Sequence, residues 1–361
     1  MLTTQANKGS EVSDFTLPSE WAPQDGIMLT WPHRDTDWAY MLDKVEAVYR
    51  ELAKAIASRQ QLVIICHNDA VQQHVASILK EDGIDSRMVH LVQAPCNDTW
   101  ARDHGPITVL DQDGKPCLLD FTFTAWGDKF NANLDNDINQ QLFQADCLAD
   151  VPHKRIDLVL EGGGIESDGA GTLLVTKKCL LNPNRNPSLN QAEIEQQLCQ
   201  HFGLQRVLWL KHGYLAGDDT DAHIDTLARF APDNTLVYVS CSDPKDEHFR
   251  ELQAMAQELT ELKTLDGKPY HLIPLPWPAA KFNAEGERLP ASYANYLIMN
   301  EVVLVPTYHD SQDAVALAQI RRAYPNHEVI GVHCLPLIQQ FGSLHCVTMQ
   351  LPKGVLKPLS C

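Results

Sequence analysis

The sequence lacks the patterns that mark membrane, secreted or disulfide-bonded proteins. It has no apolar run long enough to span a bilayer. Its polar opening, MLTTQANKGSEVSDF, lacks the basic-then-apolar order of a secretory signal. The ten cysteines are scattered, with no CxxC pair among them. We therefore expect a protein of the cytoplasm with reduced thiols, and no membrane partner.

Basic residues are scarce. The chain has 29 Lys and Arg against 47 Asp and Glu, which gives a net charge of −18. Nucleic acids and anionic membranes both require a basic surface, so neither is an expected partner. A cationic substrate fits this balance, but solubility alone would account for it unless a specific acidic site exists. The 44% hydrophobic and 21% charged content is that of a globular protein.

Linkers and low-complexity segments are also missing, so nothing in the sequence divides the chain. A length of 361 residues suffices for one large hydrophobic core. We expect a single domain over 1–361, with a short polar N-terminal lead over 1–15. A homo-oligomer is compatible with the sequence but is not indicated by it.

Strand and helix patterns alternate along the chain. The stretch 26–31 reads as a strand, and Thr36 is a plausible N-cap for a helix over 37–59, where apolar residues recur at helical spacing. Turn signals predict β-hairpins. The hairpin turns are expected at 113–114 and 232–234, and further helices at 189–201, 246–262 and 313–323.

Loops rich in Gly, Asp or His recur after strands at similar intervals. They are centred near Asp103, Glu161 (58 residues on), His223 (62 further) and Cys346 (123 further, about two intervals). The missing loop falls at 292–300. A recurring strand–loop–strand unit with helices between is typical of radial or solenoid repeats. Five such units would account for the length, with their loops converging on one axis.

Cys346 lies on a small-residue loop just before a short strand pattern, in FGSLHCVTMQLP. A thiol placed there can be presented to a cleft. A buried, inert packing role is the usual one for a cysteine. The neighbouring His345 would also fit half of a metal site, so Cys346 alone leaves the chemistry open.

Two other loops carry acids that packing does not need. In NDTWARDHGP, we interpret Asp98 as a turn residue and Asp103 as a functional one. In EGGGIESDG, Glu161 ends a strand, and the three glycines allow a close approach of the backbone or a sharp turn. The spacing differs from GxGxxG and no helix pattern follows, which excludes a dinucleotide site.

His223 and Asp225 lie two residues apart in GDDTDAHIDT, hence on one face if the segment is extended. A histidine beside carboxylates suits acid–base catalysis. A metal site using His223, Asp225 and His345 is an alternative, but the sequence has no HExxH, CxxC or HxH pair. A cysteine protease is disfavoured, because several acids around a thiol oppose formation of the thiolate.

The same acids become useful if the ligand is cationic. A guanidinium offers paired N–H donors that carboxylates bind bidentately. Once bound, its charge offsets the acids and favours the thiolate. Its carbon is a poor electrophile, so it needs clamping, a strong nucleophile and an acid for the leaving amine.

The chain resembles the agmatine deiminases and bacterial peptidylarginine-deiminase-like proteins of the guanidine-modifying pentein superfamily. The resemblance spans nearly the whole length. It rests on EWAPQDGIMLTWPH, NDTWARDHGP, FTFTAWGDKF, LEGGGIESDGAGTLLVT, LNPNRNP, GDDTDAHIDTLARF, ASYANYLIMN and GSLHCVTMQLP. It implies a five-bladed α/β-propeller built from ββαβ-type repeats around a central active site.

The resemblance also implies roles. Cys346 would be the nucleophile and His223 the general acid and base. Asp103 and Asp225 would clamp the guanidinium, and Glu161 would hold His223 or a substrate nitrogen. Attack would give a covalent thiouronium, and water would then release a ureido product: from agmatine, N-carbamoylputrescine and ammonia. No cofactor or metal would be needed.

The resemblance implies that the loop just before Cys346 shapes substrate access. The segment 339–344 lacks the longer glycine run usual in agmatine-specific relatives. Trp100 would flank the substrate's alkyl stem. Asp219, within the cluster Asp218, Asp219 and Asp221, would meet a distal ammonium or simply be solvated. Alternatives are a deiminase of free or peptidyl arginine, whose carboxylate would want a nearby cation, and a non-catalytic binding propeller.

Overall fold

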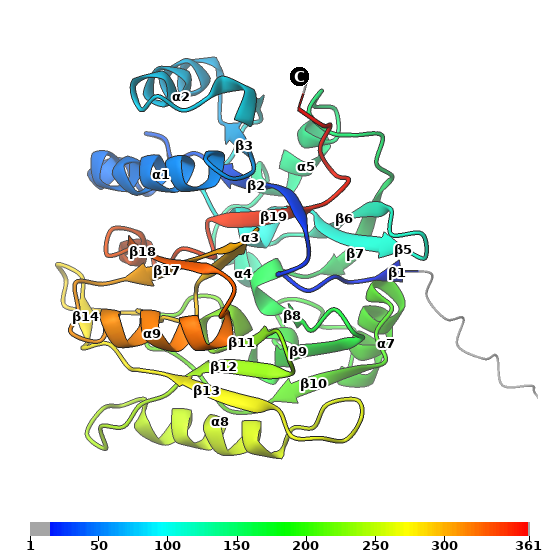
Figure 1. Cartoon of the computed structure of the whole chain (residues 1–361), viewed down its shortest axis with the longest axis vertical. Coiled ribbons are helices and arrows are strands. Elements are labelled where there is room, and N and C mark those ends of the chain that lie inside the picture. The colour runs from blue at the N-terminus through cyan, green and yellow to red at the C-terminus, as the bar shows by residue number, and fades with distance from the viewer. Residues whose placement is uncertain (1–14, 360–361) are drawn as a thin grey trace, which may run out of the picture.

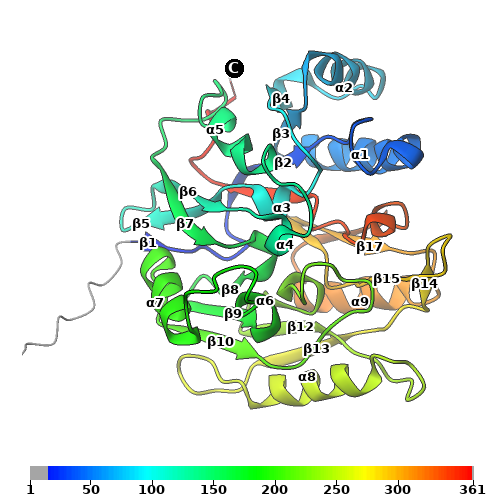
Figure 2. The same cartoon turned by 180° about the vertical axis from the view of Figure 1, so that it is seen from behind.

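A computed structural model describes residues 15–359 as a mixed α/β protein (Figures 1 and 2). The polar lead predicted over 1–15 lies, apart from Phe15, outside the described residues. Among the described helices, none combines the length and apolar character that crossing a membrane requires. The nine cysteines of this part of the chain are all free thiols, in line with the prediction of reduced cysteines.

The strands form five sheets of three or four strands, and a small hairpin adds a sixth. The sheet orders are β19-β2-β3-β4, β1-β5-β6-β7, β10-β9-β8, β11-β12-β13 and β16-β17-β18, with the hairpin β14-β15. The bounds are β1 Phe15–Thr16, β2 Gln24–Thr30, β3 Gln61–Cys66, β4 Val89–Gln93, β5 Ile107–Asp111, β6 Pro116–Thr122, β7 His153–Val159, β8 Glu166–Ser167, β9 Thr172–Thr176, β10 Arg206–Leu210, β11 Ala228–Ala231, β12 Thr235–Val239, β13 His271–Leu275, β14 Lys281–Phe282, β15 Arg288–Leu289, β16 Leu297–Met299, β17 Val302–Thr307, β18 Glu328–His333 and β19 Thr348–Pro352.

One pairing pattern recurs in all five larger sheets. An antiparallel pair is followed by a parallel pair: β19 runs antiparallel to β2 and β2 parallel to β3. The same order holds for β5-β6-β7, β8-β9-β10, β11-β12-β13 and β16-β17-β18. Parallel neighbours need a crossover, and a helix lies between the two parallel strands of each unit. The repeat predicted from the loop spacing is therefore a ββαβ unit.

The longer helices lie outside the sheets. In both views α1, α2, α7 and α8 lie at the edge of the molecule, whereas the short α3 and α4 lie near its middle (Figures 1 and 2). The bounds are α1 Leu42–Ala57, α2 Asp69–Glu81, α3 Ala101–His104, α4 Ala125–Asp128, α5 Ile138–Leu142, α6 Lys177–Leu180, α7 Gln191–Phe202, α8 Phe249–Glu261 and α9 Asp313–Ala323.

The predicted helix over 37–59 begins later than expected. Its apolar stripe is buried as predicted. The Thr36 hydroxyl, however, donates to the His33 carbonyl and accepts from the Trp38 amide, so it closes a turn. A short 3₁₀ turn then leads into α1, and the N-cap prediction for Thr36 is wrong. The predicted hairpins β5-β6 and β11-β12 are confirmed.

The loops that the sequence singled out all precede the first strand of a unit. Asp103 precedes β5, Glu161 precedes β8, His223 precedes β11 and Cys346 precedes β19. The region 292–300, where the fifth loop was expected, leads into β16. Five equivalent positions of the repeat therefore supply the residues discussed next.

Candidate active site

Cys346 lies buried among polar groups from other repeats. Its thiol is 3.4 Å from Asn295 Oδ1 and 3.8 Å from Asp225 Oδ2. Burial, and then the charges of Asp225 and Asp103, raise the pKa of the thiol well above its ordinary value. Without a ligand, the acids therefore suppress the thiolate, as the sequence suggested.

His223 is fully buried between two carboxylates. Its Nδ1 lies 3.7 Å from Asp103 Oδ1, and its Nε2 lies 3.7 Å from Glu161 Oε2. Burial opposes the charged form, but Asp103, followed by Cys179 and Glu161, outweighs it and raises the pKa of His223 well above its ordinary value. The imidazole therefore holds a proton that it can give to a leaving amine.

Asp103 is fixed from two sides. Its Oδ1 accepts from the Gly163 amide at 3.1 Å, and its Oδ2 accepts from Trp126 Nε1 at 3.0 Å. Burial raises the pKa of Asp103 to about 6, with the positive charge of His223 opposing the shift. The carboxylate is thus ionised near neutral pH and held in one orientation.

Glu161 has a dedicated arginine partner. Arg185 Nε donates to both carboxylate oxygens, at 3.0 and 2.9 Å, and both side chains are fully buried. Burial favours the protonated acid, but His223 and Arg185 outweigh it and lower the pKa of Glu161. Because Arg185 occupies this carboxylate, the geometry favours a role in holding His223 over direct contact with a substrate nitrogen.

Asp225 uses only one of its oxygens. Oδ2 accepts from His345 Nδ1 at 2.8 Å, whereas the buried Oδ1 has no hydrogen-bond partner among the described residues. His223 Nδ1 and Nε2 and Asn295 Nδ2 are buried without partners in the same way. Buried polar atoms are normally paired. Four unpaired atoms around one thiol therefore mark the place where a polar ligand would bind.

Asn295 was not singled out from the sequence, although its region was. Its Oδ1 accepts from the backbone amide of His345 at 2.9 Å and lies at the Cys346 thiol. This side chain therefore contacts both the backbone of the loop that carries Cys346 and the sulfur. The spacing of the repeat was the signal that could have found it.

The triple glycine makes the close approach that the sequence allowed. A Cβ at Gly163 would lie 2.6 Å from His223 Nδ1 and 2.8 Å from Asp103 Oδ1. We expect Gly163→Ala to displace one of these groups and to lower turnover by about 10²-fold, as is usual for a misplacement on the order of 1 Å. Steady-state kinetics and thermal unfolding would be measured together.

Gly164→Ala is the matched control. Its Cβ would lie 3.4 Å from Cys179 Sγ and 3.8 Å from His223 Nε2, ordinary van der Waals distances. Turnover near that of the parent protein is expected. An equal loss in both variants would mean that the helical turn itself, and not the contact with His223, is sensitive.

A cavity of about 90 Å³ opens above Cys346. Trp100, Trp126 and Phe130 give it aromatic walls, and its remaining lining consists of Asp37, Asp98, Asp103, Asp219, Thr220, Gln340, Phe341, Gly342 and Cys346. Four of these residues are acids, and within residues 15–359 no lysine or arginine lines it. A larger hollow of about 890 Å³ near Pro116 and Pro352 lacks the convergent groups described above. We therefore place the site at the smaller cavity.

The outer acids divide by their partners. Asp218 is used by its own loop, accepting from Thr220 and Ala222. Asp221 pairs with Arg185 and Lys129. Asp219 lines the cavity, and only its backbone carbonyl is held, by Lys129. Of these three acids, Asp219 alone is among the residues that line the cavity.

Trp100 and Asp98 also reach the cavity. Trp100 is buried, and its Nε1 donates to Asp98 Oδ2 at 2.9 Å. Asp98 Oδ1 accepts from Trp38 Nε1 and from the Thr99 amide. This agrees with the interpretation of Asp98 as a structural residue.

Three arginines of the quoted sequence motifs are candidate partners for a substrate carboxylate. Arg102 donates to Glu20, and Arg229 donates to Glu166. Arg185 serves Glu161 as described. All three are buried and engaged by protein acids, and none lines the cavity.

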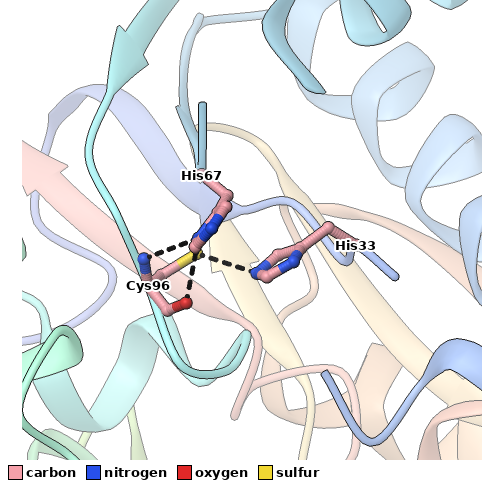
Figure 3. Close-up of side chains that lie close together, drawn as sticks. All are labelled: His33, His67 and Cys96. Atoms are coloured by element: carbon pink, nitrogen blue, oxygen red, sulfur yellow. Dashed lines mark hydrogen bonds between the residues drawn. The ribbon is translucent and has the colours of Figure 1, made fainter. Parts of the chain in front are cut away.

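Within residues 15–359, two groups of His, Cys or Glu side chains lie close enough together to be candidate metal ligands. One, Glu161 with Cys179 and His223, belongs to the site above. The other is His33, His67 and Cys96, which follow the adjacent strands β2, β3 and β4 (Figure 3). Their imidazole rings stack at 4.0 Å between centroids and 23° between planes. An ion bound by two imidazoles lies in the plane of each, which nearly parallel stacked rings do not permit.

The same stack occurs in another repeat. His309 follows β17 and His333 is the last residue of β18; their rings stack at 3.8 Å between centroids and 12° between planes. The recurrence at equivalent strand ends indicates that the His33–His67 pair is packing between neighbouring loops. His345, the third member of the metal alternative, is engaged by Asp225 and Glu20.

Comparisons with known proteins identify relatives of this chain. Residues 16–352 match the Porphyromonas-type peptidyl-arginine deiminase family. The agmatine deiminase of Pseudomonas aeruginosa strain LESB58 is 33% identical over 94% of this chain and 95% of its own. A provisionally named arginine deiminase structure from Porphyromonas gingivalis is 48% identical, with a TM-score of 0.87 over 95% of this chain and 99% of its own. A cysteine-to-serine agmatine deiminase from C. jejuni with substrate bound is 38% identical, with a TM-score of 0.86 over 94% and 97%.

Proposed function

The chain belongs to the Porphyromonas-type peptidyl-arginine deiminase family, and from this premise we propose that it hydrolyses the guanidinium of agmatine to N-carbamoylputrescine and ammonia. The carrying observation is a buried thiol beside Asp225, whose Oδ1 is unpaired among the described residues, under a cavity with acidic and aromatic walls. A bound guanidinium supplies a positive charge that offsets the acids of the site. The substrate is small and cationic, and water is the only other reactant.

Asp103 and Asp225 bind the guanidinium nitrogens from two sides of the thiol. Their negative charges raise the pKa of Cys346 while the site is empty. A bound cation offsets them, so the thiolate forms when there is a carbon to attack. This coupling protects the thiol from reacting with other electrophiles.

The Cys346 sulfur bonds to the guanidinium carbon and gives a tetrahedral adduct. His223 donates a proton to one amine, which leaves as ammonia, and a covalent thiouronium remains. His223 then takes a proton from water, which attacks the same carbon and releases the ureido product and the thiolate. Nδ1, on the side of Asp103, exchanges this proton, because Nε2 faces the Glu161–Arg185 pair.

The five ββαβ units are proposed to be the blades of one propeller, forming a single catalytic domain over 1–361. The support is that their first strands all follow a residue of the site. Each blade then contributes one polar loop to the central cavity.

The acidic cavity favours agmatine over arginine. The α-carboxylate of arginine would enter a space lined by Asp37, Asp98 and Asp219 with no cation among the described lining residues. Like-charge juxtaposition costs several kcal/mol, so we expect kcat/KM for agmatine to exceed that for arginine by about 10²-fold or more. Ureido product formation measures both.

Argininamide and an arginyl peptide separate charge from size. If the carboxylate is what the cavity rejects, argininamide should recover much of the lost efficiency. A preference for the peptide over agmatine would replace the proposal with the peptidylarginine alternative.

Asp219→Asn should raise KM for agmatine and leave kcat nearly unchanged. No turnover of any guanidine would contradict the enzyme proposal.

A further inference from the structure

Glu20 lies on the segment between β1 and β2, 325 residues from His345, yet its carboxylate reaches the loop that carries Cys346. Its two oxygens lie 2.8 and 2.9 Å from His345 Nε2. Arg102 Nη1 donates to it at 3.0 Å and Gln350 Nε2 at 2.9 Å, and Arg229 Nη2 also donates to it. The segment between β1 and β2 thus supplies a carboxylate that contacts His345, the residue before Cys346.

His345 connects this anion to the clamp. Its Nδ1 donates to Asp225 Oδ2 at 2.8 Å, and within residues 15–359 the Asp225 side chain has no other hydrogen bond apart from its contact with the thiol. The imidazole is fully buried and its backbone amide is held by Asn295. The orientation of Asp225, and hence of its unpaired Oδ1, therefore depends on His345.

We propose that Glu20 is a positioning residue that acts through His345 to hold Asp225 ionised and aligned for the guanidinium. This rests on the proposed function, since Asp225 is the clamp in that reaction. The chain of contacts is Glu20 to His345 Nε2, and His345 Nδ1 to Asp225.

The charges around His345 set the direction of the effect. Burial and the charges of Arg102 and Arg229 lower the pKa of His345, whereas Glu20 and Asp225 oppose them. Arg229 Nη2 lies 3.1 Å from Nε2 and favours an unprotonated nitrogen there, while Glu20 favours a protonated one. Glu20 therefore increases the positive charge that His345 presents to Asp225.

Asp225 responds to that charge. Burial raises the pKa of Asp225, but the hydrogen bond and charge of His345, with His223 and Arg229, outweigh burial and lower it. Weaker positive charge on His345 moves the pKa of Asp225 upward. The acid must be ionised to bind a guanidinium, so the low-pH limb of kcat/KM moves to higher pH.

The test is Glu20→Gln in the full-length protein, a change that keeps the shape and the acceptor for Arg102. We expect kcat/KM for agmatine to fall by about 10- to 100-fold, the size common for residues that orient a ligand-binding group. The loss should appear mostly in KM, and the acid limb should shift upward. Unchanged KM and an unchanged acid limb in a folded variant would overturn the inference.

Asp120→Asn is the control for loss of a buried acid. Asp120 is fully buried and accepts from Asn139, Gln140 and Arg155, without contact to His345. It should lower thermal stability without moving the acid limb. A similar shift in both variants would show a general effect of lost charge and would contradict a role through His345.

A double-mutant cycle with His345→Asn tests the route. Asparagine can place an amide donor near Nδ1 but has no group at the Nε2 position, so Glu20→Gln should add little in that background. Full additivity would overturn the proposed route. If Glu20→Gln alone fails to fold, Glu20→Asp replaces it in the same cycle, with a smaller effect expected.

A readout without turnover separates this inference from the proposed function. Chloroacetamidine carries an amidinium beside an alkylating carbon, so its reaction with Cys346 needs the clamp, while iodoacetamide is neutral. The ratio of the two alkylation rates should fall in Glu20→Gln and stay unchanged in Asp120→Asn. If this ratio is the same in Glu20→Gln as in the parent protein, the inference is contradicted. If the parent protein is alkylated by chloroacetamidine but hydrolyses no agmatine, only the proposed function is contradicted.

Discussion

Replacing Cys346 by alanine should abolish ureido product formation from agmatine, with kcat falling by about 10⁴-fold or more. The reason is that the guanidinium carbon is a poor electrophile, and Cys346 is the one thiol of residues 15–359 that contacts both Asp225 and Asn295. Water would have to attack directly, against the resonance of the cation. Product release under saturating agmatine is the measurement, with the folded state checked by thermal unfolding.

Cys199→Ala is the control for loss of a thiol. Cys199 lies half-buried on α7, away from the cavity lining, and its removal should leave turnover near that of the parent protein. Mass spectrometry of Cys346 peptides from the parent protein, quenched during turnover, should show an added amidine. Turnover that survives Cys346→Ala would rule out covalent catalysis by this residue.

The repeat was readable from the sequence because it has a local signature. Each loop follows an apolar strand and carries Gly, Asp or His, and the hydrophobic pattern of α1 or α9 is that of an isolated amphipathic helix. Such signals depend on neighbours along the chain. The N-cap prediction at Thr36 was wrong because its hydroxyl donates to the His33 carbonyl and accepts from the Trp38 amide, and so closes a turn before the helix.

Apart from Asn295, the residues brought together around Cys346 were named from the sequence, but the side chains that support them were not. Glu20 and Arg229 meet His345 across separations of 325 and 116 residues. Arg185 and Trp126 lie within quoted motifs, yet nothing local shows that they hold Glu161 and Asp103. Contacts of this kind depend on how the sheets are placed, which local patterns do not encode.

The segment 339–344 has a structural reason for its composition. A Cβ at Gly342 would lie 2.1 Å from Trp100 Cζ3, so only glycine fits against the indole. Gln340, Phe341 and Gly342 line the cavity, and Phe341 has a positive φ of 63°. The segment therefore shapes substrate access. Because it lacks a longer glycine run, Phe341 lines the cavity at a position where a smaller residue would leave more room.

Asp225→Asn should have two effects of opposite sign. Loss of the clamp charge should lower kcat/KM for agmatine by about 10²- to 10³-fold, the usual cost of removing one partner of a buried charge contact. The thiol should become more reactive toward neutral iodoacetamide, because Asp225 is the largest contributor after burial to the raised pKa of Cys346. A variant with a disordered site would also lose turnover. The midpoint of its alkylation rate against pH, however, would not move to lower pH.

The alkylation rate against pH therefore distinguishes the two cases. In Asp225→Asn the midpoint of thiol ionisation should move to lower pH, since a negative charge beside the sulfur has been removed. Asp219→Asn, which removes an acid from the outer cavity, should change KM and leave that midpoint in place. If the midpoint does not move in Asp225→Asn, the acids do not restrain the thiol. Substrate charge would then have no part in its activation, and the fit between an acidic site and a cationic ligand would concern binding alone.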